Sequence, residues 1–238
     1  MPVPVRAVLC DLDDTLFDHC RATREALAHS VASHACFSTL SLDEIDRRHR
    51  ELLETLHLDV LAGRLAADDA RVERFWRLIE GGAPGQGDAH CRDLARAYRQ
   101  SYERCWHLVD GAIALLTLMK AAGLTVVIVT NNNVLEQEQK LRLLGLAAFV
   151  DALVTSEEVG DSKPAPAIFE VALKRATCSI DQAVMLGDAW GTDIAGARAL
   201  GLRAVWLNRF GAPSPDASVA ELRSLEPAAE ALRVILGS

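Results

Sequence analysis

The feature of this chain that most limits its fold is a series of short, continuous apolar runs separated by helical patterns. The runs are rich in β-branched residues and do not alternate in polarity, which is typical of strands buried on both faces. The segments between the later runs have helical periodicity and end on glycine or begin after proline. This order predicts an α/β fold, a parallel sheet with helices on both faces. The predicted strands are VRAVLC from Val5, TVVIVT from Thr125, DALVT from Asp151, AVMLG from Ala183 and RAVWL from Arg203.

One long stretch breaks this alternation. Between residues 18 and 107 the chain has helical patterns and no convincing strand, so we expect an all-helical domain inserted after the first strand. Residues 1–17 and 108–238 would then form the α/β domain. The chain has 238 residues, of which 50% are hydrophobic and 24% charged, and it can bury one substantial core and a smaller second one.

Composition also limits which cellular compartment and which partners are expected. No apolar stretch approaches the roughly 20 residues of a membrane span, and the N-terminus lacks a basic region followed by a long apolar one. Six cysteines are scattered without a CxxC pair, which favours reduced thiols over disulfides or a zinc site. The net charge of −8 disfavours nucleic acid as a partner. We expect a cytoplasmic protein, monomer or homodimer, that acts on a small molecule without binding a membrane.

Polar residues follow four of the predicted strands. Ligands of open parallel sheets bind beyond the carboxyl ends of the strands, so chemistry is expected there. We expect these side chains to meet at one edge of the sheet. They are Asp11, Asp13 and Thr15 after the first strand, Thr130 and Asn131 after the second, Lys163 in the loop after the third, and Asp188 and Asp193 after the fourth.

Each of these motifs has a simpler structural explanation when it is taken alone. Two aspartates in a surface loop are usually solvated, and Thr130 with Asn131 could cap a helix that begins near Val134. Asp188 or Thr192 could cap the next helix in the same way. Four such motifs in chain order, each at a strand end, favour a functional site instead.

The four motifs together resemble those of the haloacid dehalogenase superfamily, in the phosphatase branch with a helical cap inserted after the first motif. DLDDT matches the first motif, VTNN the second, the lysine of SKPAPAIF the third and GDAWGTD the fourth. The resemblance implies a Rossmann-like parallel sheet with an all-helical cap domain. The segment LFDHCRATREAL is similar to the start of the cap in phosphatases of nucleoside monophosphates or N-acylneuraminate 9-phosphate.

A phosphate monoester carries two negative charges and repels nucleophiles, so an enzyme must neutralise it, align it and protonate the leaving oxygen. The resemblance implies a Mg²⁺-dependent phosphatase in which Asp11 attacks phosphorus and forms an aspartyl-phosphate. It implies that Asp13 protonates the leaving alcohol and later takes a proton from water.

Crowding Asp11 beside Asp188 and Asp193 would be costly without a cation, and oxygen ligands of this kind suit Mg²⁺. By the same resemblance the Mg²⁺ ligands are the carboxylates of Asp11 and Asp188 and the main-chain carbonyl of Asp13, with Asp193 in support. Positive charge and donors for the phosphoryl oxygens would come from Thr130, the amide of Asn131 and Lys163.

Three other functions are possible on this fold. A 2-haloacid dehalogenase would use the same nucleophile, but it needs neither Mg²⁺ nor an acid for an alkoxide, so Asp13 together with Asp188 favours phosphate. A phosphomutase would keep all these residues and return the phosphoryl group to substrate. A binding or regulatory protein would be marked by the loss of Asp11, Asp13, Lys163 or Asp188, and all four are present. The preferred prediction is a phosphatase of a small phosphorylated metabolite.

Overall fold

The computed structural model describes residues 3–31, 34–79 and 88–237. The chain divides into two compact units. One unit consists of Met1–Asp18 and Leu108–Ser238 and is called the α/β unit below. The other consists of His19–His107 and is called the helical unit. Each is described by itself.

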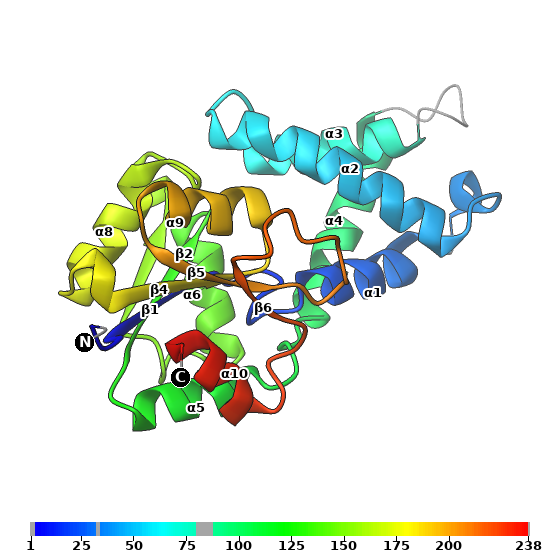
Figure 1. The fold of residues 1–238 in the computed structure, drawn as a ribbon. Coiled ribbons are helices and arrows are strands. Elements are labelled where there is room, and N and C mark those ends of the chain that lie inside the picture. The colour runs from blue at the N-terminus through cyan, green and yellow to red at the C-terminus, as the bar shows by residue number, and fades with distance from the viewer. Residues whose placement is uncertain (1–2, 32–33, 80–87, 238) are drawn as a thin grey trace. The chain divides into compact units, whose positions relative to one another are not determined.

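A six-stranded parallel sheet forms the centre of the α/β unit, in the order β3-β2-β1-β4-β5-β6 (Figure 1). The prediction of an α/β fold with a parallel sheet is confirmed. All four residues of β1 are buried, because this strand has neighbours on both sides and helices over both faces. The strands are β1 (Ala7–Cys10), β2 (Thr125–Thr130), β3 (Ala152–Thr155), β4 (Ala183–Gly187), β5 (Arg203–Leu207) and β6 (Ala220–Leu222).

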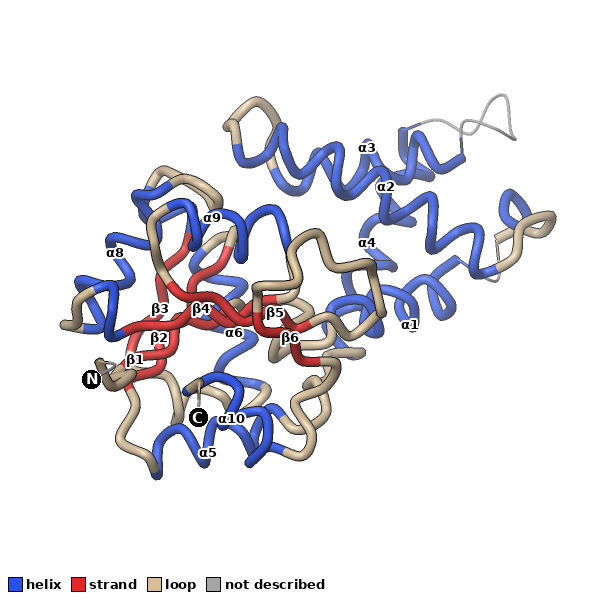
Figure 2. The backbone as a smooth tube through the Cα atoms, viewed as in Figure 1, coloured by secondary structure: helices blue, strands red, loops and turns tan. Residues whose placement is uncertain are grey.

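Helices cover both faces of this sheet. Figure 2 shows α8 and α9 on one face and α5 and α10 on the other. Under α8 and α9 lies an apolar core that includes Leu9 of β1, Phe169 of α8 and Trp206 of β5. The helices of this unit are α5 (Ala112–Ala121), α6 (Val134–Leu143), α7 (Ser156–Val159), α8 (Pro166–Ala176), α9 (Ala195–Ala199) and α10 (Ala228–Leu236), with a 3₁₀ turn η2 (Ile180–Gln182) and a π-helical turn η3 (Trp190–Ile194).

The register of the sheet aligns the ends of the central strands. Cys10, the last residue of β1, lies opposite Ile128 in β2 and Leu186 in β4. The main-chain N–H of Asp11 then donates to the carbonyl of Leu186 at 2.9 Å. Residues that follow these strands therefore emerge at the same edge.

The helical unit contains α1 (His19–Val31), η1 (Ala35–Phe37), α2 (Leu42–Leu61), α3 (Ala67–Ile79) and α4 (Asp88–Arg104). No strand lies among its described residues, as the insert was predicted to be all-helical. α1 packs against α4 and α2, and α3 packs against α2 and α4. Phe75 of α3 and Tyr98 of α4 are both buried, and the centroids of their rings lie 5.4 Å apart. Over the described part of the chain, no helix combines the length and apolar character that crossing a membrane requires.

Candidate active site

A tight turn after β1 shapes the first part of the site. The N–H groups of Thr15, Leu16 and Phe17 all donate to the carbonyl of Leu12. Asp14 has a φ of 61°, a left-handed conformation that aspartate tolerates better than most residues. The turn brings the Thr15 hydroxyl back toward the end of the strand. Its Oγ1 lies 3.1 Å from Asp11 Oδ2 and 3.3 Å from Asp188 Oδ1.

Three of the predicted carboxylates converge at the edge of the sheet. One carboxylate oxygen from each of Asp11, Asp188 and Asp193 lies within 4.8 Å of the other two. Asp188 follows β4 directly, and Asp193 is presented by the π-helical turn. This close approach requires a glycine at the end of β4, because a Cβ on Gly187 would lie 2.3 Å from Asp193 Oδ2. The main-chain N–H of Ala189 donates to the same oxygen at 3.0 Å.

Lys163 supplies the positive charge of this cluster. Its Nζ lies 2.6 Å from Asp11 Oδ1 and 2.7 Å from Asp193 Oδ1, and the residue is buried. The side chain of Asn131 forms two hydrogen bonds with the main chain of Lys163, one as donor and one as acceptor. Asn131 Nδ2 donates to the Lys163 carbonyl at 2.8 Å, and the Lys163 N–H donates to Asn131 Oδ1 at 2.7 Å. The second and third predicted motifs are thus joined in the structure.

The charges of this cluster are not balanced by the protein alone. Burial, together with the charges of Asp193 and Asp13, raises the pKa of Asp11 to about 7 in spite of Lys163. Burial and the neighbouring charges of Asp11, Asp193 and Asp14 raise the pKa of Asp188 well above its ordinary value. Burial opposes the charge on Lys163, but Asp11 and Asp193 more than offset it and raise the pKa of the amine. The cluster therefore favours a further cation.

This donor set fits Mg²⁺. The groups that converge are carboxylates, the oxygen ligands that Mg²⁺ prefers, and they leave excess negative charge beside a single lysine. The raised pKa values of Asp11 and Asp188 are what such a site shows when only protons are available to neutralise it. The cluster includes the two predicted ligands Asp11 and Asp188 and the predicted supporting residue Asp193.

Asp13 lies in a separate hydrogen-bond network, formed with residues of α6, that the sequence does not predict. Lys140 Nζ lies 2.6 Å from Asp13 Oδ1, and Gln137 Nε2 donates to Asp13 Oδ2 at 2.8 Å. Gln137 Nε2 also donates to the hydroxyl oxygen of Thr130 at 2.9 Å. Lys140 and Gln137 belong to α6, where polar residues three positions apart normally face solvent, so the sequence carries no signal of their burial.

The capping roles considered for these residues are filled otherwise. Asn133 is the N-cap of α6 and accepts a hydrogen bond from the N–H of Glu136, so neither Thr130 nor Asn131 is needed there. The hydroxyl of Thr192 donates to Asp193 Oδ1 at 3.3 Å, and the N-cap residues of η3 and α9 are Ala189 and Ile194. These observations favour the functional interpretation of the motifs over the structural one.

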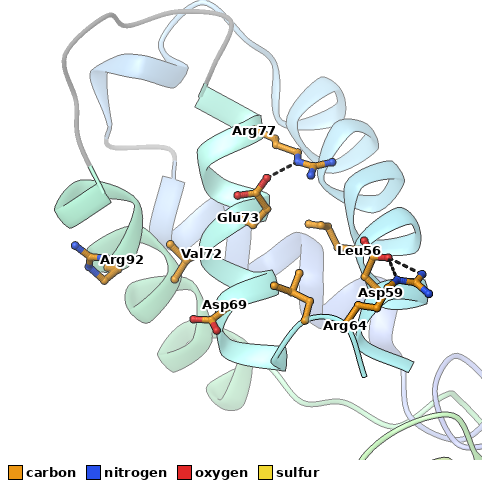
Figure 3. A pocket seen from close by; sticks show the side chains of 9 residues that line it. Leu56, Asp59, Arg64, Asp69, Val72, Glu73, Arg77 and Arg92 are labelled. Carbon is orange, nitrogen blue, oxygen red and sulfur yellow. Dashed lines mark hydrogen bonds and ion pairs between the residues drawn. The ribbon is translucent and has the colours of Figure 1, made fainter. Parts of the chain in front are cut away.

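The helical unit contains a cavity of about 550 Å³ between α2, α3 and α4 (Figure 3). Its lining includes three acids and three arginines, so it offers no excess positive charge to an anion. Arg64 is paired with Asp59, and Arg77 with Glu73. The other lining residues are Leu56, Leu65, Asp69, Val72 and Arg92.

Comparison with known proteins agrees with this geometry. Residues 5–201 match the haloacid dehalogenase-like hydrolase family. The chain belongs to that family. It is 34% identical over 221 residues to ribulose-1,5-bisphosphate 5-phosphatase of Halopiger xanaduensis, an alignment that covers 90% of this chain and 88% of that protein. It is 27% identical over 222 residues to N-acylneuraminate-9-phosphatase of Mus musculus, covering 87% and 84%.

A solved structure is similar over the full length. The HAD-hydrolase YfnB from Bacillus subtilis, bound to magnesium, superposes with a TM-score of 0.76 at 26% identity and covers 99% of this chain and 100% of that chain. The predicted family, fold class and enzyme class are confirmed: this chain is a haloacid dehalogenase-like hydrolase, and the two curated relatives above are phosphatases.

Proposed function

We propose that this protein is a Mg²⁺-dependent phosphatase that hydrolyses a small phosphorylated metabolite through a phosphoryl group carried on Asp11. The observation that supports this most is the convergence of the Asp11, Asp188 and Asp193 carboxylates, two of which contact Lys163, while burial and neighbouring charges raise the pKa of Asp11 and Asp188. A site of this kind suits a divalent cation and a phosphate group together.

The proposed reaction has two steps. In the first, a carboxylate oxygen of Asp11 attacks phosphorus, the bond to the leaving oxygen breaks, and Asp13 gives that oxygen a proton. In the second, Asp13 takes a proton from water, the water oxygen attacks phosphorus, and the bond to Asp11 breaks to release phosphate. The first step leaves Asp13 without its proton and able to accept one from water. The second step restores protonated Asp13 and unmodified Asp11.

Donors at the sheet edge would bind the phosphoryl oxygens. Lys163 brings a positive charge beside Asp11, and Asn131 holds the backbone of Lys163 in place. Thr130 accepts a hydrogen bond from Gln137, which leaves its hydroxyl proton for donation. Donors fixed in this way need no reorganisation when charge moves during the reaction. We assign Thr130, the amide of Asn131 and Lys163 to phosphate binding.

Bound Mg²⁺ would offset the negative charge of the acidic cluster and of the phosphate as the phosphoryl group is transferred. We propose that Asp11, the main-chain carbonyl of Asp13 and Asp188 hold it. Asp193 supports them through its contacts with Lys163 and with the N–H of Ala189.

We propose that the helical unit is the cap domain and that it selects the substrate. Two relatives, at 34% and 27% identity, have names that specify different phosphorylated substrates, so we assign neither substrate to this chain. We propose a free phosphorylated metabolite in the cytoplasm as substrate, turned over by a monomer or homodimer.

The test is phosphate release from a broad panel of phosphomonoesters, with and without Mg²⁺. We expect Mg²⁺-dependent release from at least one alkyl phosphate, loss of that release in Asp11→Asn, and no loss in the matched control Asp181→Asn on the exposed surface of the α/β unit. A parallel assay with 2-haloacids separates the dehalogenase alternative. Halide release without phosphate release would refute the proposal, and so would full activity in Asp11→Asn.

A further inference from the structure

Helix α6 buries two polar residues, Gln137 and Lys140, and exposes two of its three leucines. Gln137 and Lys140 are 0% and 1% exposed, whereas Leu135 and Leu143 are 79% and 61% exposed. Gln137 and Lys140 therefore lie on the buried side of the helix with Leu141, where an ordinary amphipathic helix has apolar residues. Burying a lysine is costly unless its charge is paired, so Lys140 requires a negatively charged partner that offsets the cost of desolvation.

That partner is the carboxylate of Asp13. Lys140 Nζ lies 2.6 Å from its Oδ1, and Gln137 Nε2 lies 2.8 Å from its Oδ2. Each carboxylate oxygen therefore has a separate donor from α6. The Asp13 side chain keeps 28% of its surface exposed, against 1% for the lysine. A substrate can therefore reach Asp13 but not Lys140.

The two donors are themselves held in place. Lys140 Nζ lies 3.2 Å from Glu136 Oε1 and 4.7 Å from the centre of the Phe17 ring. Gln137 also donates to Thr130 at the end of β2. The pair thus ties Asp13, in the turn after β1, to both α6 and the neighbouring strand, and the carboxylate has little freedom to rotate.

We propose that Lys140 and Gln137 are positioning residues that fix the Asp13 carboxylate for proton transfer to the leaving group. The inference rests on the phosphatase function proposed above. An ionised carboxylate oxygen has two lone-pair sites, so each Asp13 oxygen can accept from α6 and still exchange a proton with substrate. A misplacement of about 1 Å in such a group can cost roughly 100-fold in rate.

The test uses the leaving group. An alkyl phosphate needs its poor leaving oxygen protonated, whereas p-nitrophenyl phosphate releases a stable anion and needs little help. In Lys140→Met we expect kcat/KM for the best alkyl phosphate of the panel to fall about 10- to 100-fold, and kcat/KM for p-nitrophenyl phosphate to fall less than about threefold. Gln137→Met should shift the ratio of the two in the same direction.

The ratio is measured within one preparation, so partial misfolding of a variant does not affect it. Lys120→Met is the matched control, because it removes an ion pair of similar length with Asp151 on the surface of the same unit. Its ratio should equal that of wild type. Equal losses on both substrates in Lys140→Met and Gln137→Met, or no loss on either, would overturn the inference and leave the phosphatase function standing. A wild-type protein that releases no phosphate from either substrate would refute both.

Discussion

The absence of a side chain at the end of β4 is the most sharply defined requirement of the site. A Cβ on Gly187 would lie 2.3 Å from Asp193 Oδ2, 2.6 Å from its Cγ and 2.7 Å from its Cβ. Contacts this short cannot be relieved by moving one flexible end, because three atoms of the aspartate are involved. Gly187→Ala must therefore displace the whole side chain of Asp193.

That displacement has a calculable cost. Overpacking a buried site of this kind costs about 2 kcal/mol, and the lost charge-assisted contacts of Asp193 to Lys163 and to the Ala189 N–H cost about 2 kcal/mol more. We expect the free energy of unfolding to fall by about 4 kcal/mol. For a chain of this size the melting temperature then falls by roughly 8–16 °C.

Thermal unfolding of wild type and Gly187→Ala measures this loss of stability. Phosphate release measures whether Lys163, which loses its contact with Asp193, still supports activity. The matched control is Gly191→Ala in the π-helical turn that follows, because nothing lies within 4 Å of a Cβ built at that glycine. Gly191→Ala should melt within about 2 °C of wild type. A Gly187→Ala protein that melts as wild type does and keeps its kcat/KM would refute the reasoning.

Two further predictions concern the metal and a buried histidine. Mg²⁺ at about 100 times its Kd should stabilise the folded protein by about 2.7 kcal/mol, a shift that EDTA reverses and that Asp188→Asn largely removes in thermal unfolding. His49 of α2 is fully buried, and burial, with the nearby charge of Arg74, lowers its pKa well below the ordinary value. Below about pH 6.5 the unfolded chain binds a proton at this residue that the folded chain does not, so stability should fall with falling pH by up to about 1.4 kcal/mol per unit. Urea unfolding at several pH values should show that slope reduced in His49→Gln; an unchanged slope would contradict this assignment.

The sequence predicts the sheet well where the strands are buried. β2, β4 and β5 have the predicted bounds, because short continuous apolar runs are typical of strands buried on both faces of a sheet. β6 was missed because an edge strand of three residues, with Ala220 exposed, needs no apolar run. α10 was also missed, although Pro227 precedes it and Gly237 follows it, which are ordinary helix boundary signals.

The site, like the sheet, could be predicted from the sequence only in part. Asp11, Lys163, Asp188 and Asp193 could be predicted to converge, because strand ends of a parallel sheet meet at one edge. The contacts of Lys140 and Gln137 with Asp13 could not be predicted, because they depend on how α6 is rotated against the sheet. The exposed Leu135 shows that local hydrophobic pattern does not set that rotation.

The central claim is that Asp11 carries the phosphoryl group, and trapping that group tests it most directly. Asp13→Asn, given p-nitrophenyl phosphate and Mg²⁺, should still accept the phosphoryl group but lose it slowly, because the base for the attacking water is missing. After acid quenching, mass spectrometry should find one phosphoryl group on the peptide that contains Asp11, and none when Asp11→Asn is added. A phosphoryl group on another peptide, or one that survives in the double variant, would contradict the account.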